Sequence, residues 1–212
     1  MKKRIVSVIL MLAMLLALTA CGSGDEDKLV GKWKCEMELA DQINAEMALD
    51  EEMAEYLNFT SFEIVVYMEF TKDGTYSMYA DKDALEATMD VVLEDFADGM
   101  AKYLEDMILS ETGVEMSAED ILAASGMTMD DMLAEAFPEG MVDEIADGMK
   151  QEGKFEAKDG KLFTSAGLDY NVDPEVYETY ELSGSTLTIT DYVGDDADEV
   201  FGVYPLVFNK VG

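Results

Sequence analysis

The stretch of sequence that decides the fold is Leu29-Val-Gly-Lys-Trp-Lys-Cys-Glu-Met-Glu-Leu39. From Lys32 on, apolar side chains occupy every second position, and lysine or glutamate fills the positions between them. The apolar members are Trp33, Cys35, Met37 and Leu39. A period of two is typical of a β-strand that buries one face. Residues 29–39 therefore predict the first strand of a sheet.

Seven further segments have the pattern or composition of strands. They cover residues 62–70, 75–80, 153–157, 161–164, 176–182, 186–190 and 206–210. Asp73-Gly74, Asp159-Gly160 and Ser183-Gly184 separate consecutive segments and predict tight turns, because glycine accepts a positive φ. Short turns make neighbouring strands antiparallel. Eight strands is the number that closes into a small barrel, either filled or holding one small ligand.

Between Asp81 and Lys150 the period changes to that of a helix. Apolar residues three or four apart run from Leu85 to Met107 and predict a long amphipathic helix. Shorter helices are predicted after the capping boxes that begin at Ser117 and Thr128, and over residues 139–149. A further helix is predicted over residues 42–57. Residues 81–150 are therefore a helical insertion between strands.

Gly31-Lys32-Trp33 matches the G-x-W motif of lipocalins. The segments 70–76 and 180–189 are similar to the hairpins of bacterial lipocalin-like lipoprotein domains. This resemblance covers about residues 29–80 and 152–211. It implies an α+β domain over residues 29–211: an eight-stranded antiparallel lipocalin-like barrel, or a strongly curved sheet, that carries the helical insertion.

The N-terminus resembles a bacterial lipoprotein signal, or lipobox. Basic residues 2–4 precede an unbroken apolar run over 5–18, which ends in Leu18-Thr-Ala-Cys-Gly22. The resemblance implies that residues 1–20 are removed and that the thiol of Cys21 receives a lipid. The protein would then be anchored to the cell membrane and face away from the cytoplasm.

A retained membrane helix is the alternative interpretation of the same run. Spanning a bilayer takes about 20 apolar residues, and this run is shorter. Residues 21–28, Cys-Gly-Ser-Gly-Asp-Glu-Asp-Lys, predict a flexible polar tether.

The charge of the chain limits its partners. Residues 1–20 hold three of the 14 basic residues, so the remainder has 11 lysines against 47 acidic residues, a net charge of −36. Such a surface repels polyanions and excludes nucleic acid as a partner. It also excludes electrostatic attraction to anionic lipid, which leaves anchoring to the acyl chains.

The composition also argues against an enzyme. The sequence has no histidine, so a Ser-His-Asp or Cys-His arrangement cannot form. No glycine-rich phosphate loop is present. Cys35 has no intrachain partner once Cys21 is lipidated, and strand parity buries it as an inert thiol. We therefore expect no catalytic residue and no cofactor.

A metal site is not expected either. The acidic clusters at 50–52, 130–131 and 195–199 lack the ligand spacing of a calcium loop and are expected to be solvated faces. A weak calcium site within residues 191–199 is the less favoured alternative.

The function that fits these features best is binding of a small apolar or amphipathic ligand outside the cytoplasm. Methionines in the helical insertion suit an adaptable apolar groove, although they also suit a soft core. Trp33 can form the floor of a ligand cavity, although a tryptophan there more often closes the base of a barrel. The candidate ligand-binding residues are Trp33, Tyr67, Tyr76, Met100, Met107 and Met132. The alternative is an acidic interaction module that binds a cationic protein or cell-wall component.

Overall fold

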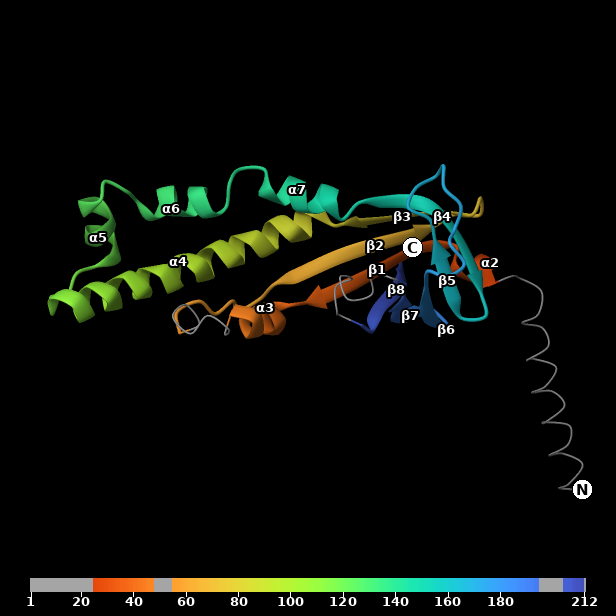
Figure 1. Cartoon of the computed structure of the whole chain (residues 1–212), viewed down its shortest axis with the longest axis horizontal. Helices are drawn as coiled ribbons and strands as arrows, with labels where there is room; N and C mark the ends of the chain where they lie inside the picture. Colours follow the sequence, from red (N-terminus) through yellow and green to blue (C-terminus); the bar gives the residue numbers. More distant parts are fainter. Residues whose placement is uncertain (1–24, 48–54, 195–203, 212) are drawn as a thin grey trace, which may run out of the picture. The chain divides into compact units, whose positions relative to one another are not determined.

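The structure is a computed structural model that describes residues 25–47, 55–194 and 204–211. Its strands are β1 (Gly31–Glu38), β2 (Glu63–Phe70), β3 (Thr75–Ala80), β4 (Gln151–Lys158), β5 (Lys161–Thr164), β6 (Tyr177–Ser183), β7 (Thr186–Val193) and β8 (Leu206–Val211). Its helices are α2 (Asp25–Leu29), α3 (Ala40–Met47), α4 (Lys82–Thr112), α5 (Ala118–Ala124), α6 (Met129–Ala136) and α7 (Met141–Gly148) (Figure 1).

The eight strands form a closed barrel in the order β1 to β8, so each strand pairs with its neighbours in the sequence. The ladders from β4 through β8 are all antiparallel. The predicted fold class is confirmed, and the sheet is a closed barrel rather than an open curved sheet.

The predicted turns lie where glycine was expected to allow them. Between β4 and β5, Asp159 and Gly160 have φ values of 55° and 74°. Two successive positive φ values make a type I′ turn, whose twist matches that of the flanking strands. Gly184, between β6 and β7, has a φ of 62°. These tight turns set the antiparallel order of the last strands.

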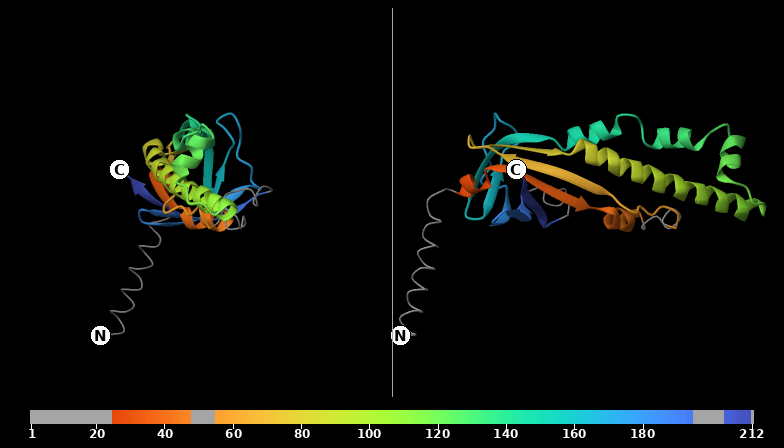
Figure 2. Two further views of the ribbon diagram at one scale, coloured as in Figure 1. Left: turned by 90° about the vertical axis from the view of Figure 1, so that its left-hand side faces the viewer. Right: turned by 180° about the vertical axis from the view of Figure 1, so that it is seen from behind.

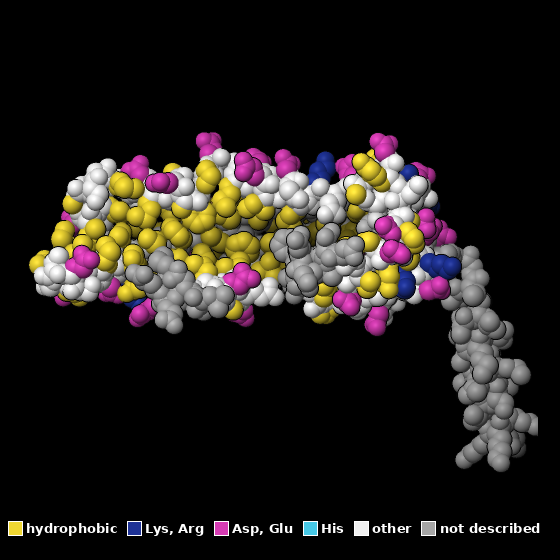
Figure 3. Space-filling model, in the orientation of Figure 1, with side chains coloured by type: hydrophobic (Ala, Val, Ile, Leu, Met, Phe, Trp, Pro, Cys, Tyr) yellow, Lys and Arg dark blue, Asp and Glu magenta, His cyan; other side chains and the backbone are white. Residues whose placement is uncertain are grey.

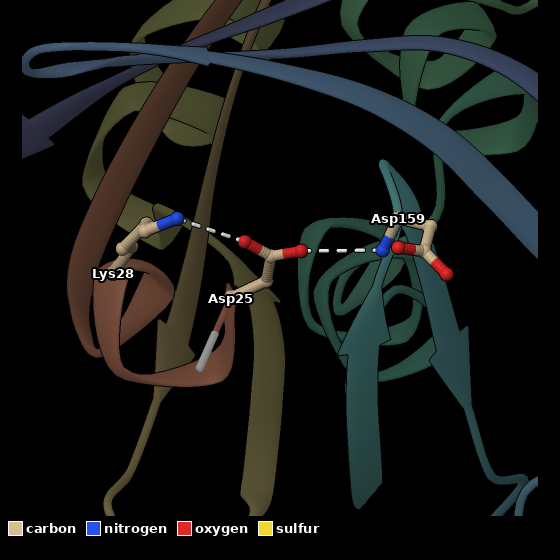
Figure 4. Close-up of polar contacts among 3 residues, drawn as sticks. All are labelled: Asp25, Lys28 and Asp159. Atoms are coloured by element: carbon tan, nitrogen blue, oxygen red, sulfur yellow. Dashed lines mark hydrogen bonds and ion pairs between the residues drawn. The ribbon is translucent and has the colours of Figure 1, made fainter. Parts of the chain in front are cut away.

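A short helix replaces part of the predicted tether. Residues 21–24 lie outside the described residues, whereas Asp25–Leu29 forms α2. Asp25 accepts a hydrogen bond from the backbone N–H of Asp159 at 3.2 Å and pairs with Lys28 at 2.9 Å (Figure 4). Acidic residues in a first turn favour a helix, and Leu29 at its end is fully buried. These contacts explain why residues 25–28 differ from a flexible linker.

The chain divides into two compact units. The barrel unit comprises the described parts of Met1–Trp33, Met68–Ser77 and Gln151–Gly212, and the helical unit comprises those of Lys34–Tyr67 and Met78–Lys150. The predicted helical insertion over residues 81–150 lies wholly within the helical unit. Strands β1, β2 and β3 each contribute residues to both units.

The barrel unit has a filled core. Its largest fully buried side chains are Leu29, Trp33, Phe70, Leu162, Leu187, Ile189 and Phe208, all at most 2% exposed. The rings of Phe70 and Phe155 meet edge to face, with centroids 4.7 Å apart. Such interlocking leaves no space between these side chains for water.

Backbone contacts join the strand ends to the helices within the helical unit. The Asp81 carboxylate caps α4 by accepting from the N–H of Ala84. The N–H of Asp81 donates to the carbonyl of Val65, and the hydroxyl of Thr88 donates to the carbonyl of Glu63 at 2.7 Å. The start of α4 is therefore fixed to β2, which explains why the strand ends belong to this unit.

The remaining helices of this unit lie beside α4. Figures 1 and 2 show α5, α6 and α7 in a row along it, on the return path of the chain. Ser117 caps α5, and Thr128 with Asp131 forms a complete capping box at α6, as predicted. Lys82 of α4 forms an ion pair with Asp143 of α7.

Candidate ligand-binding groove

The predicted ligand-binding residues divide between the two units. The barrel unit holds Trp33 and Tyr76. The helical unit holds Tyr67, Met100, Met107 and Met132.

Trp33 is enclosed by the barrel unit. Its side chain is fully buried, and its Nε1 donates a hydrogen bond to the carbonyl of Leu29 at 2.7 Å. The ammonium of Lys210 lies 4.9 Å from the centre of its ring. Because no part of the ring is accessible to water, it has no surface to offer a ligand. This environment fits the alternative in which Trp33 closes the base of the barrel.

Tyr76 is also a core residue. It is 6% exposed, and its hydroxyl donates to the carbonyl of Ser165 at 3.3 Å. Burial raises the pKa of this hydroxyl above its usual range. Tyr76 therefore supports the packing of β3, and its ring does not face an open cavity.

Glu178 is a half-buried carboxyl group beside this core. It pairs across the ladder with Leu162, which is fully buried, so its side chain lies on the same face. Burial raises the pKa of Glu178 to about 7, and the hydroxyl of Tyr204, which donates to it at 3.3 Å, opposes that rise. At neutral pH this carboxyl group is close to half protonated.

The interior of the barrel unit, as far as it is described, offers no ligand cavity beside its large core residues. Side chains with no water-accessible surface cannot line a space that admits even a water molecule. Among the described residues, exposed large apolar side chains occur in both units: Leu168, Tyr170, Val193 and Val207 in the barrel unit, and Leu109, Val114 and Met116 in the helical unit.

Tyr67 faces away from the barrel interior. Its neighbours Val66 and Met68 are 4% exposed, whereas Tyr67 is half-buried. Its ring packs on that of Tyr79, with centroids 5.5 Å apart. The pair joins β2 to β3 on the outer face of the sheet.

The helical unit has its own buried residues, among them Leu57, Leu85 and Leu122. Phe59, Met89 and Val92 form one buried cluster of this unit. Phe96 on α4 meets Phe137 edge to face, with centroids 5.1 Å apart, and only partly covers that cluster. Helices α6 and α7 have no fully buried residue.

These helices are amphipathic, and their apolar faces stay half open. On α6, Met132 and Leu133 are half-buried while Ala134 and Glu135 are exposed. On α4, Met100 and Met107 are likewise half-buried. We call this surface the apolar groove; its main residues are Phe96, Met100, Met107, Met132, Leu133 and Phe137. Figure 3 shows hydrophobic side chains gathered between α4 and the row of α5, α6 and α7, with acidic side chains along the edges.

A shallow pocket lies beside α5 and the start of α6, and none of the residues that define the apolar groove lines it. The pocket has a volume of about 420 Å³ and is lined by Leu122, Ala123, Met127 and Met129, with Glu119 and Asp130 beside them. At the far end of α4, Leu109 and Val114 are 42% and 54% exposed. Contiguous exposed apolar surface of this kind marks a binding site in soluble domains.

Gly99 explains why α4 can pack closely at this point. A Cβ at Gly99 would lie 2.5 Å from the carbonyl oxygen of Tyr56. The ring of Tyr56 meets Tyr103 one turn further along, with centroids 5.3 Å apart. A side chain here would push α4 away from the preceding segment.

The other predicted sites are the lipidation site, the acidic loop and the buried cysteine. Cys21 lies outside the described residues, as does most of the acidic loop at 191–199. Within the described chain, no group of three or more acidic or cysteine side chains is arranged to hold a metal ion. Cys35 is buried. None of the helices in residues 25–47, 55–194 and 204–211 combines the length and apolarity needed to cross a bilayer.

Sequence reasoning did not single out Phe96, Phe137 or Glu178 as site residues. The first two were visible as members of apolar helical stripes, but the pattern did not show which stripes would remain open. Glu178 was visible as an acid in phase with Tyr180 and Leu182 on one strand.

No protein-family model, curated protein or solved structure matches this chain.

Proposed function

We propose that this protein is a non-enzymatic lipoprotein, anchored to the cell membrane through a lipid on Cys21, that binds an apolar or amphipathic ligand outside the cytoplasm. The observation that carries the ligand-binding part is the apolar groove of the helical unit. Its methionines are flexible and adapt to varied apolar shapes. Its acidic edges disfavour fatty acids and other anions, so the ligand is neutral or cationic.

The binding test uses the chain from Gly22 on, because every described helix and strand lies within residues 25–211. Nile red, a neutral dye, is titrated into this chain. We expect saturable fluorescence enhancement that weakens severalfold in Met132→Gln. Ala134→Gln on the exposed face of the same helix is the matched control and should leave the affinity unchanged. Equal binding by both variants and the parent would place the site elsewhere, and no binding would refute the proposal.

The anchor is tested separately in cells. Metabolic labelling with a palmitate analogue should mark the wild-type protein and fail to mark Cys21→Ser. Equal labelling of the two proteins would refute lipidation at Cys21.

A second candidate function is an acidic interaction module that binds a cationic protein or cell-wall component. The observation in its favour is the charge of residues 83–149, which contain 19 acids and one lysine, a net −18. Attraction of this kind is screened by salt, with a screening length of about 8 Å at physiological ionic strength. Binding that disappears in salt and is unaffected by Met132→Gln would favour this second function.

A further inference from the structure

The apolar groove is bordered by negative charge on the helices that form it. Figure 3 shows acidic side chains along the margins of the apolar surface. The exposed acids of α6 are Asp130, Asp131 and Glu135; those of α7 are Glu144, Asp147 and Asp143, which pairs with Lys82. A surface with an apolar floor and anionic edges is complementary to an occupant that is apolar in the middle and cationic at its sides.

The length of the groove also restricts the occupant. Half-buried or exposed apolar residues continue along α4 from Phe96 to Leu109, beyond the buried Met89. From Phe96 to Leu109 the helix advances about 20 Å, at 1.5 Å per residue. An α-helix of about 13 residues has the same length. A compact small molecule would cover only part of this length.

We propose that the groove binds a cationic amphipathic α-helix of a partner polypeptide. This inference rests on the proposed ligand-binding function and names the class of its ligand. Apolar side chains at helical spacing would lie on the methionine-rich floor, as in other helix-in-groove complexes. Lysine or arginine on the flanks of the partner helix would face the acidic edges.

Charge argues against the other occupants of such a groove. A second copy of this chain would bring two surfaces of net −18 together. An anionic lipid surface is repelled for the same reason. A neutral small molecule would leave the acidic edges without a counterpart.

The binding experiment compares three labelled peptides of 20 residues by fluorescence anisotropy, with the chain from Gly22 on. The first is a leucine-lysine peptide patterned as an amphipathic helix; the second scrambles it at constant composition; the third replaces its lysines with glutamate. We expect the first to bind at least about tenfold more tightly than either of the others and to gain helical circular dichroism on binding. Equal affinity for the scrambled peptide would reduce the interaction to simple charge attraction and overturn the inference.

Protein variants test the location. Met132→Gln should weaken the first peptide by at least about fivefold, with Ala134→Gln as its control. Glu119→Gln with Asp130→Asn should weaken it and flatten its salt dependence. Glu156→Gln with Glu181→Gln removes the same charge from exposed strand positions of the barrel unit and should have less than about a twofold effect. Equal losses in the two charge variants would overturn the proposed location.

The dye separates failure of this inference from failure of the proposed function. If Nile red binds and Met132→Gln abolishes that binding while the helical peptide does not bind, the groove takes small apolar ligands and the helix proposal is wrong. If neither probe binds, both proposals fail.

Discussion

The two units of this protein use their apolar residues differently. In the barrel unit, Trp33, Leu162, Leu187 and Ile189 are fully buried. In the helical unit, α6 and α7 bury no residue completely, although both are amphipathic. The same kind of sequence pattern therefore leads to a closed core in one unit and to an open apolar surface in the other. The half-buried apolar faces of the helical unit are the candidate binding surface.

This difference predicts that stability and binding are separable. Fully burying a large apolar side chain contributes about 1.5–3 kcal/mol, so the barrel unit owes its stability to residues that no ligand touches. A half-buried side chain contributes less to folding and keeps surface for a partner. Mutations in the two units should therefore have different consequences.

The largest expected effect comes from a cavity in the barrel unit. Leu187→Ala should lower the free energy of unfolding by about 2–5 kcal/mol, because Leu187 is fully buried and its surroundings cannot collapse to fill the space. Met132→Ala in α6 should cost less, about 1 kcal/mol, because its side chain is only half-buried. Urea titrations followed by the fluorescence of Trp33, the only tryptophan, would report the first variant. Similar losses of unfolding free energy in Leu187→Ala and Met132→Ala would contradict the proposed difference between the two units.

The second prediction makes the barrel unit sensitive to pH through Glu178. Its pKa rises from 4.5 to about 7 because partial burial disfavours its charged form. The folded protein thus keeps a proton that the unfolded chain releases, and stability falls as the pH increases through this window. The contribution lost is at most about 3 kcal/mol, since each pKa unit corresponds to 1.36 kcal/mol.

The measurement is the free energy of unfolding of Glu178→Gln relative to wild type, between pH 4 and pH 8. Relative to wild type, the variant should gain stability as the pH rises and reach a plateau above pH 7. The comparison between proteins cancels the opposite slopes of carboxylates such as Glu38, whose pKa is lowered mainly by the backbone N–H of Phe62. Glu181→Gln, exposed on the same strand, should run parallel to wild type.

Much of this architecture was predictable because its signals are local. The alternation around Trp33, the Asp159-Gly160 turn and the Thr128 capping box each depend on residues close in sequence, and the structure contains all three elements. The predicted number of strands then limited the sheet to a small barrel. The closed barrel was predicted from the number of strands and not from any single residue.

What the sequence did not predict depends on distant contacts. The helix at Asp25 is held by Asp159, more than 130 residues away. The helical unit includes strand ends because α4 bonds to β2 through Thr88. Periodicity marks an apolar face on α6 and on α4 alike, but only the fold determines how much of each face is covered. The position of the groove therefore also depends on distant contacts, which the sequence pattern does not reveal.

The third prediction tests close packing in the helical unit with two glycines. Gly99→Ala should destabilise the protein by about 1–3 kcal/mol, because the new Cβ would lie 2.5 Å from the carbonyl oxygen of Tyr56. Gly148→Ala, in α7, meets no atom within 4 Å and should stabilise the protein by about 0.5–1 kcal/mol through helix propensity. Circular dichroism at 222 nm would follow both. Effects of the same sign would show that α4 is not packed closely at Gly99.

The smallest effect per interaction is the repulsion between like charges, and it should differ between the two units. Like charges one turn apart on a helix repel by about 0.2–0.5 kcal/mol per pair, and residues 83–149 carry a net −18. Salt should therefore raise the melting temperature of the helical unit, followed by circular dichroism, more than that of the barrel unit, followed by Trp33 fluorescence. Most of the rise should be complete by a few tenths molar salt, because the screening length is about 8 Å at physiological ionic strength.

Calcium and sodium at matched ionic strength distinguish diffuse repulsion from a metal site. If the acidic residues form a solvated face, the two salts should raise the melting temperature equally. A larger rise at millimolar calcium would indicate a site that the described residues do not contain. If neither salt affects the helical unit, repulsion does not limit its stability, and the acidic edges would then have to be explained by binding alone. In that case, neutralising Glu119 and Asp130 should change peptide affinity without changing the melting temperature.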